Sequence, residues 1–469
     1  MKSVLYCYIF FALLFFPACR RQLDVVPTNN NWTDSEQQLS SFEGIMEAVN
    51  GNYILLRNNN STLYWLNELR GNTFRKPLIN PFGYLDIFNY SRDPGLLSTE
   101  DYWVGAYTLI IACNRVLEGL ARFEKSKQFT DLPPANSALL LHAKGETYFL
   151  RAYTYFNLVR LFGRPYYQRP QMNPGVIVKN NTDINFIPGR STVSEVYAQI
   201  IEDLKTADSI MAADVGRTNA FATKPAVWAL LSRVYLYMGG TYDTPDKDIN
   251  QQALLYANKV INAGKFQLLK GKAYDTLLYN GKYNNPETIF ASIYIDVNNA
   301  LGENTYYGGL SAAPSLLQAF MEHDYRRDFF WATTSSPLTV TTKYGRRAAP
   351  FIHLRLAEVY LNKAEALLKM DNTAEALDAV NIIHTRAGLP PLLYSSRAQL
   401  QKDIIRERRL ELCFEGHSGF DDYRNGLPMV RPAIDADTAF EVLPADKKVV
   451  LLIPQREMDA NPKMVQNEQ

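Results

Sequence analysis

Apolar residues recur every three or four positions in several long stretches of the chain, which is the spacing of one face of an α-helix. Residues 223–240 begin with Thr223 and Pro225 and end at a Gly-Gly pair, and residues 254–264 repeat the same spacing. Thr and Pro favour the first turn of a helix, and Gly favours its end. The two stretches therefore predict a helical hairpin.

The same pattern returns further along and earlier in the chain. Residues 354–368 and 373–387 predict a second hairpin, and residues 145–163 carry a third copy in which small and large residues alternate. Residues 364–377 are similar to a tetratricopeptide unit, although no strict period runs through the chain. We therefore predict a mainly α fold, a tetratricopeptide-like helical repeat scaffold with loop-rich inserts and minor β structure.

Two segments depart from the helical pattern. Residues 58–100 and 266–350 are rich in Asn, Gly and Tyr, which favour turns and loops. Within the second segment, residues 288–295 are mostly β-branched and aromatic, which predicts a short strand. Loop-rich inserts on a rigid frame are where a ligand site is expected.

The N-terminus has the pattern of an exported, lipid-anchored protein. Lys2 precedes an apolar run from Val4 to Phe16, and Ala18-Cys19 is followed by Arg20. Residues 1–18 therefore predict a lipoprotein signal peptide with Cys19 as the acylated residue, and residues 19–30 a tether; cleavage at an ordinary small-residue site is the alternative. The apolar run is shorter than the roughly 20 residues that span a bilayer, and we expect no later segment to span one.

Composition narrows the possible partners. The chain has 469 residues, 47% of them apolar, and its net charge is +1. A chain of this kind folds around a large core, and it lacks the basic field that attracts nucleic acid. Cys113 and Cys413 lie in apolar helical patterns and are interpreted as buried thiols, and no zinc-ligand spacing is present.

Five stretches together resemble the SusD/RagB family of surface lipoproteins. Leu23–Pro27 follows the lipoprotein cysteine as in the family, and the remaining matches are 150–163, 355–366, 405–417 and 453–462. They occur in one order along the whole mature chain. The resemblance implies an N-terminal part, 31–265, with the insert 58–100, and a C-terminal part, 266–469, with the insert 266–350, helices over 351–416 and C-terminal loops.

The resemblance also implies a function. Family members are anchored in the outer membrane, face the cell exterior and cover a SusC-like TonB-dependent transporter, to which they deliver a captured nutrient, most often a glycan. They are not enzymes, and neither a cofactor nor a metal ion is implied. The family's binding loops vary with the nutrient, so no motif assigns ligand residues to this chain.

Glycan capture requires aromatic rings against the sugar face and polar groups for its hydroxyls. The aromatic candidates in the irregular segments and beside them are Tyr64, Trp65, Tyr90, Trp103, Tyr283, Tyr306 and Tyr307. Their polar neighbours are Asn67, Asn89, Arg92, Asn285 and Asn304. Trp103 lies in a predicted helical run, where a role in the core is at least as plausible as ligand contact.

Other classes of function remain open at this point. A peptide or host-protein receptor on the same fold is the nearer alternative, and a surface glycoside hydrolase is the more distant one. Glu407, Glu411 and Glu415 step by four along one helix face, which suits a metal or an acid–base pair. Because Arg406, Arg408, Arg409 and Arg424 are interleaved with them, we interpret the glutamates as members of an ion-pair network.

Overall fold

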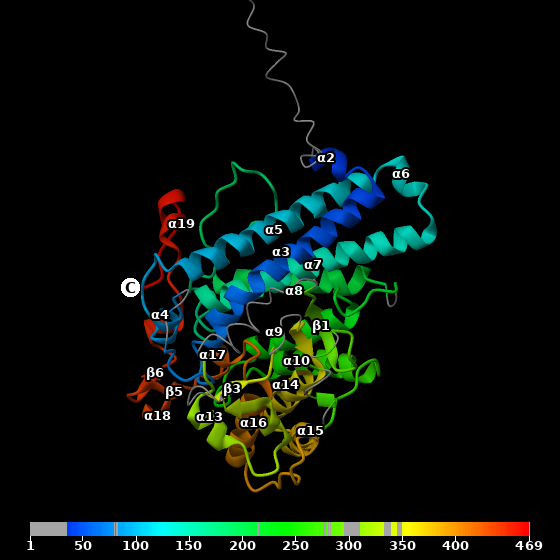
Figure 1. The fold of residues 1–469 in the computed structure, drawn as a ribbon. Coiled ribbons are helices and arrows are strands. Elements are labelled where there is room, and N and C mark those ends of the chain that lie inside the picture. The colour runs from blue at the N-terminus through cyan, green and yellow to red at the C-terminus, as the bar shows by residue number, and fades with distance from the viewer. Residues whose placement is uncertain are drawn as a thin grey trace, which may run out of the picture.

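Long helices form the frame of the molecule (Figure 1). The computed structural model describes residues 35–78, 80, 83–212, 215–271, 273–274, 278–279, 281, 283–294, 310–332, 339–344 and 349–468. Figure 1 shows two layers, with the longest helices in the upper half and the C-terminal hairpins below them. The prediction of a mainly α protein with minor β structure is confirmed.

Three antiparallel helices build the upper layer. They are α3 (Phe42–Glu68), α5 (Leu97–Phe123) and α7 (Pro134–Phe162), with the short α2 (Ser35–Gln38) and α6 (Lys127–Thr130) at their ends. The Ser41 hydroxyl accepts a hydrogen bond from Gly44 N and starts α3. Residues 58–68, expected to be irregular, continue α3, because packing of α3 on α5 and α7 outweighs the poor helix propensity of the three Asn residues at 58–60.

Helical hairpins follow, as the sequence predicts. Helix α8 (Val193–Ile210) starts with a capping box between Thr192 and Glu195. The hairpin α9 (Lys224–Met238) and α10 (Lys247–Asn262) packs against the hairpin α14 (Leu356–Lys369) and α15 (Thr373–Arg386), and α16 (Arg397–Leu412) covers the second hairpin. Asp246 caps α10 by accepting a hydrogen bond from Ile249 N.

Six short strands pair antiparallel in the described part of the chain. Strand β1 (Thr288–Ser292) pairs with β4 (Phe351–Arg355), β2 (Phe330–Ala332) with β3 (Thr339–Thr341), and β5 (Met429–Arg431) with β6 (Phe440–Val442). The strand predicted at 288–295 is thus present as β1. Leu354, predicted on a helix face, lies instead in β4, and the helix begins two residues later.

Short helices and the C-terminal segment complete the fold. The short elements are α4 (Tyr84–Phe88), α13 (Pro314–Ala319), η4 (Tyr325–Phe329), α17 (Ser418–Asp421), η5 (Tyr423–Asn425), α18 (Ala433–Ala436), η6 (Lys447–Val449) and α19 (Gln455–Ala460). The last residues return to the upper layer, where Leu451 N donates to Leu161 O at 2.9 Å and Trp103 Nε1 donates to Glu457 at 3.2 Å. The end of the chain therefore binds helices formed by its first third.

Helix α5 bears on the expectation that no later segment spans a bilayer. It is long and apolar enough, by length and composition alone, to cross a membrane. One face of it, which includes Ala106, Leu109, Ile110 and Cys113, is buried against α3 and α7, whereas Leu97 and Val104 are exposed. We therefore interpret α5 as the central core helix of the upper layer. Both Cys113 and Cys413 are buried free thiols, as predicted.

Candidate ligand-binding site

A surface pocket of about 570 Å³ opens where α3, α4 and the start of α5 meet. This size falls within the usual range for small-molecule sites. We call it the α3–α5 pocket, and it is lined by Ser61, Thr62, Trp65, Asn80, Gly83, Tyr84, Asp86, Asp93, Gly95, Leu96, Leu97, Ser98 and Asp101.

Asn80 and Gly83, which precede α4, form one side of the pocket. Asn80 Oδ1 accepts a hydrogen bond from Leu85 N at 2.7 Å, and Asn80 Nδ2 donates to Asp86 at 3.1 Å. Gly83 has a φ of 74°, and a Cβ there would lie 2.9 Å from Leu96 Cδ1. Glycine is thus required by both the left-handed backbone and the close approach of Leu96.

Two aromatic rings form the apolar wall. The Trp65 and Tyr84 ring centroids lie 4.9 Å apart, and the rings are tilted by 42°. Trp65 is 3% exposed, and its indole Nε1 has no hydrogen-bond partner in the part of the chain that the structure describes. Burial raises the pKa of Tyr84, so this phenol stays neutral at physiological pH.

The opposite wall is the turn that leads into α5. Asp93 Oδ1 accepts a hydrogen bond from Gly95 N at 2.8 Å, and Pro94 O accepts one from Gln455 N at 2.9 Å. Ser98 Oγ, in the first turn of α5, has no partner among the described residues. Rings and polar side chains therefore face one pocket, the combination that holds a hydroxyl-rich ligand with apolar faces.

Most of the aromatic candidates from the sequence lie elsewhere. Of the seven, Trp65 alone lines this pocket. Tyr64 and Trp103 are 0% and 2% exposed in the main core, and Tyr90 is 5% exposed, with its hydroxyl 2.6 Å from that of Tyr423. All three were candidates for ligand contact, and for Trp103 a core role was considered at least as plausible. In this conformation all three are core side chains packed among other aromatic rings. Trp65 is about as buried, but it lines the pocket and these three do not.

The remaining candidates are spread or lie outside the described residues. Tyr283 is partly buried against the main core. Tyr306, Tyr307, Asn304 and Cys19 fall outside the described ranges, so their predicted roles stay predictions.

The polar candidates are also separate from the pocket. Asn67 and Asn285 are 4% and 6% exposed, and Asn89 is exposed. The Arg92 guanidinium donates to Lys447 O and Val450 O at 2.6 and 2.7 Å, which fixes the C-terminal segment. Their part in ligand binding remains untested.

Sequence reasoning identified the pocket's segment but missed most of its residues. Tyr84, Asp86, Asp93 and Asp101 were not singled out. The sequence did contain an indication of these residues: Asn80-Pro81 and Asp93-Pro94-Gly95 are turn sequences on either side of a short helix.

Two other pockets of comparable size are present in the described part of the chain. One, of about 390 Å³, lies beside His142 and Arg217, and another, of about 650 Å³, lies beside Tyr325 and Arg386. The arginines named here are already paired, the partly buried Arg217 with Glu146 and the buried Arg386 with Glu287 and Glu411. The α3–α5 pocket alone among these three combines two aromatic rings with polar groups that lack protein partners.

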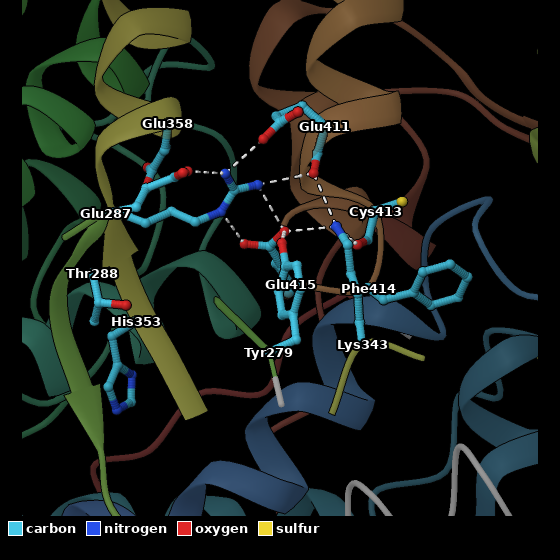
Figure 2. A network of polar contacts seen from close by, with 12 residues as sticks. Tyr279, Glu287, Thr288, Lys343, His353, Glu358, Glu411, Cys413, Phe414 and Glu415 are labelled. Atoms are coloured by element: carbon cyan, nitrogen blue, oxygen red, sulfur yellow. Dashed lines mark hydrogen bonds and ion pairs between the residues drawn. The ribbon is translucent and has the colours of Figure 1, made fainter. Parts of the chain in front are cut away.

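Glu407 and Glu411 of α16 belong to a buried ionic cluster (Figure 2). Glu415 also belongs to it, but it lies beyond the end of the helix on which all three were expected. The members of the cluster are Glu287, Asp324, Arg326, Lys343, Arg355, Arg386, Glu407, Glu411 and Glu415. Figure 2 shows Glu411, Glu415 and Lys343 converging on one another, and Lys343 Nζ donates to Glu415 at 2.8 Å. Burial by itself would raise the pKa of Glu411, but Arg386, Arg355 and Arg326 hold it well below its ordinary value.

The network interpretation is therefore right in kind and wrong in its partners. Arg408 pairs with Asp421, and Arg424 with Glu365 and Asp421, rather than with Glu407, Glu411 or Glu415. The cations of the cluster come from η4, β4, the preceding helix α15 and Lys343, and none of them lies within α16. The described residues contain no group of three His, Cys, Asp or Glu side chains placed to hold a metal ion.

Comparison with known proteins gives a consistent result over most of the chain. Residues 23–236 match a family model described as starch-binding associating with outer membrane, and residues 271–469 match the model of the SusD family. A SusD-like protein P2 of Formosa agariphila is 27% identical over 390 residues, covering 71% of this chain and 72% of that protein. A SusD-like protein of Bacteroides ovatus is 25% identical, covering 68% and 64%.

Solved structures agree with this fold. A putative sugar binding protein from Bacteroides vulgatus superposes with a TM-score of 0.78 at 25% identity, covering 91% of this chain and 98% of that one. A SusD superfamily protein from Bacteroides thetaiotaomicron superposes with a TM-score of 0.80 at 24% identity, covering 92% and 100%.

Proposed function

Because this chain belongs to the SusD family, we propose that it is an outer-membrane lipoprotein that captures an oligosaccharide in the α3–α5 pocket. The observation that carries the proposal is the pairing of Trp65 and Tyr84 beside polar side chains in a pocket of about 570 Å³. Aromatic rings pack on the C–H faces of a sugar, while carboxylate and amide groups accept its hydroxyl protons.

The proposal includes a route into the cell. Acylated Cys19 tethers the protein to the outer membrane on the outside of the cell, and a TonB-dependent transporter receives the captured glycan. The family description places its members with starch binding at the outer membrane, which supports the location. A Cys19→Ala variant of the full chain is expected to leave the membrane fraction of the cell while its pocket still binds glycan.

Binding without turnover is part of the proposal. A glycoside hydrolase needs two carboxyl groups about 5–10 Å apart across the scissile bond. The carboxylates of the α16 cluster are buried among arginines, so no substrate reaches them. In the pocket, Asp86 and Asp93 are each held by a local hydrogen bond, from Asn80 and Gly95 N. These contacts support structural and binding roles for both.

Calorimetric titration of the chain lacking residues 1–19 tests the proposal. The panel contains neutral, amino and acidic polysaccharides and a protein digest, with release of reducing ends measured in parallel. The informative variant is Ser61→Phe, because Ser61 lines the pocket and the added ring fills it. The matched control is Ser209→Phe, at an exposed position of α8.

Saturable glycan binding that Ser61→Phe loses and Ser209→Phe keeps, with both variants melting like the parent, supports the proposal. Equal binding by a folded Ser61→Phe variant places the site elsewhere. Binding of peptides alone favours the peptide receptor, and release of reducing ends that an Asp101→Asn variant loses favours the hydrolase.

A further inference from the structure

The charged residues that line the α3–α5 pocket are all acidic. They are Asp86, Asp93 and Asp101, and the lining that the structure describes includes no Lys, Arg or His. An aspartate carboxylate carries one negative charge at neutral pH. The pocket is therefore strongly negative in a chain whose net charge is only +1.

Positive groups near the pocket do not cancel this charge. The N-terminus of α5 contributes about half a positive charge through its helix dipole, against three carboxylates. Arg456, on the adjoining α19, is 79% exposed and lies 3.4 Å from its own acidic partner, Glu100. The guanidinium of Arg92 is engaged by the backbone carbonyls of the C-terminal segment.

The carboxylates have capacity left for a ligand. Asp86 uses one oxygen for Asn80, and Asp93 uses one for Gly95 N. No hydrogen bond from a described residue reaches the second oxygen of either, nor the carboxylate of Asp101. Beside them the indole Nε1 of Trp65, a side chain that is 3% exposed, also lacks a partner among the described residues. Asp93 and Asp101 are exposed, so a ligand that binds their free oxygens replaces only water.

We propose that the α3–α5 pocket selects neutral or amino sugars and rejects glycans that carry carboxylate or sulfate groups. The selection rests on the proposed function, because it concerns the ligand of the same pocket. Hydroxyl and ammonium groups donate hydrogen bonds to the free carboxylate oxygens. A uronate or sulfate brings only acceptors and a like charge, which repels all three aspartates.

Calcium bridging is the one route by which an acidic pocket holds an acidic sugar. It requires several carboxylates converging on one ion. In the described residues, no three acidic, His or Cys side chains come close enough for that. The pocket's carboxylates therefore act as separate charges and hydrogen-bond acceptors.

The test compares pairs of oligosaccharides that share a backbone and differ in charge. One pair is mannohexaose and hexamannuronate, and the other is N-acetylchitohexaose and chitosan hexaose; the members of each pair share a β-1,4 backbone. Affinity electrophoresis makes the same comparison with whole neutral, amino and acidic polysaccharides. At low salt we expect each acidic group in the pocket to weaken binding about tenfold relative to the neutral sugar. At about 1 M salt, where screening acts over about 3 Å, the difference is expected to vanish.

Paired variants separate the pocket's charge from the charge of the whole chain. The Asp93→Asn/Asp101→Asn variant keeps the side-chain shape and the acceptor for Gly95 N but removes two charges. The control, Asp243→Asn/Asp248→Asn, removes two charges at exposed positions outside the pocket. We expect only the pocket variant to gain about tenfold or more in affinity for the acidic ligand and to lose preference for chitosan hexaose over its neutral counterpart.

The outcomes distinguish this inference from the proposed function. Acidic ligands that bind the parent as tightly as neutral ones, with or without added Ca²⁺, overturn the charge selection and leave glycan capture standing. Equal gains in both double variants also overturn it, because the effect then belongs to net charge. If no oligosaccharide or polysaccharide binds, the proposed function itself fails, and the selection fails with it.

Discussion

Replacing Arg355 with Met tests whether the buried ionic cluster stabilises the C-terminal part of the chain, which contains all of its members. Arg355 is the last residue of β4 and is 1% exposed. Its guanidinium donates to Glu415 at 2.6 and 2.8 Å, to Glu411 at 2.6 Å, to Glu287 at 2.9 Å and to Glu411 O at 2.9 Å. Methionine keeps much of the side-chain length and removes the charge and all five contacts.

The expected loss follows from what the substitution leaves behind. Three buried carboxylates each lose a cation, and only Arg326, Lys343 and Arg386 remain to compensate them. Breaking a buried pair on one side typically costs about 3–5 kcal/mol, because the remaining charge stays buried without its partner. We expect a loss in that range, which is a large part of the usual free energy of unfolding of about 5–15 kcal/mol.

Urea unfolding followed by circular dichroism measures this loss, and Arg456→Met is its matched control. The same side chain is removed there from a pair in which the arginine is 79% exposed, so the expected loss is about 0–1 kcal/mol. A loss for Arg355→Met no larger than that of the control would refute the reasoning, because the cluster would then add no net stability.

Two further predictions concern the junction between α3 and the turn after α16. Burial raises the pKa of Glu68 to about 7, so the folded protein keeps a proton that the unfolded chain releases, and stability falls as pH rises from about 4.5 to 7. In urea unfolding, the stability of the parent relative to a Glu68→Gln variant should fall by about 2–3 kcal/mol between about pH 5 and pH 8; a constant difference would contradict the raised pKa. A Cβ at Gly419 would lie 2.1 Å from Asn67 O, so Gly419→Ala should lower the unfolding free energy by about 1–3 kcal/mol. The control is Gly51→Ala within α3, where the added Cβ meets nothing within 4 Å. This change should raise the free energy of unfolding by about 0.5–1 kcal/mol. Equal effects of the two changes would contradict this account.

The helical frame could be predicted because its signals are local. The hairpin of α9 and α10 shows in the spacing of apolar residues and in the residues that start and stop each helix. The prediction of a loop from residue 58 is wrong, because the helix there depends on tertiary contacts that a short stretch of sequence does not reveal. Asn60 is 0% exposed between packed helices, so tertiary contact keeps a poor helix former in α3.

The pocket and the ionic cluster depend on contacts between distant residues. Tyr64 and Trp65 are neighbours in the sequence and look equivalent there, yet only Trp65 reaches the pocket, because α3 turns the two rings in different directions. Glu411 finds Lys343 and Arg355, which precede it by 68 and 56 residues. Sequence spacing gives neighbours at three and four positions and no information on such pairs.

The return of the C-terminal segment to the first helices has a consequence for when the protein can fold. The wall of the α3–α5 pocket is held by Gln455 N on Pro94 O, and Asn467 Nδ2 binds Phe162 O at 2.9 Å. While the chain is being synthesised or threaded through a membrane from its N-terminus, these partners are the last to emerge. Contacts across such long sequence separations form slowly. We therefore expect the α3–α5 pocket to be completed only after the C-terminal segment is available, so that a chain exported from its N-terminus would complete the pocket after export.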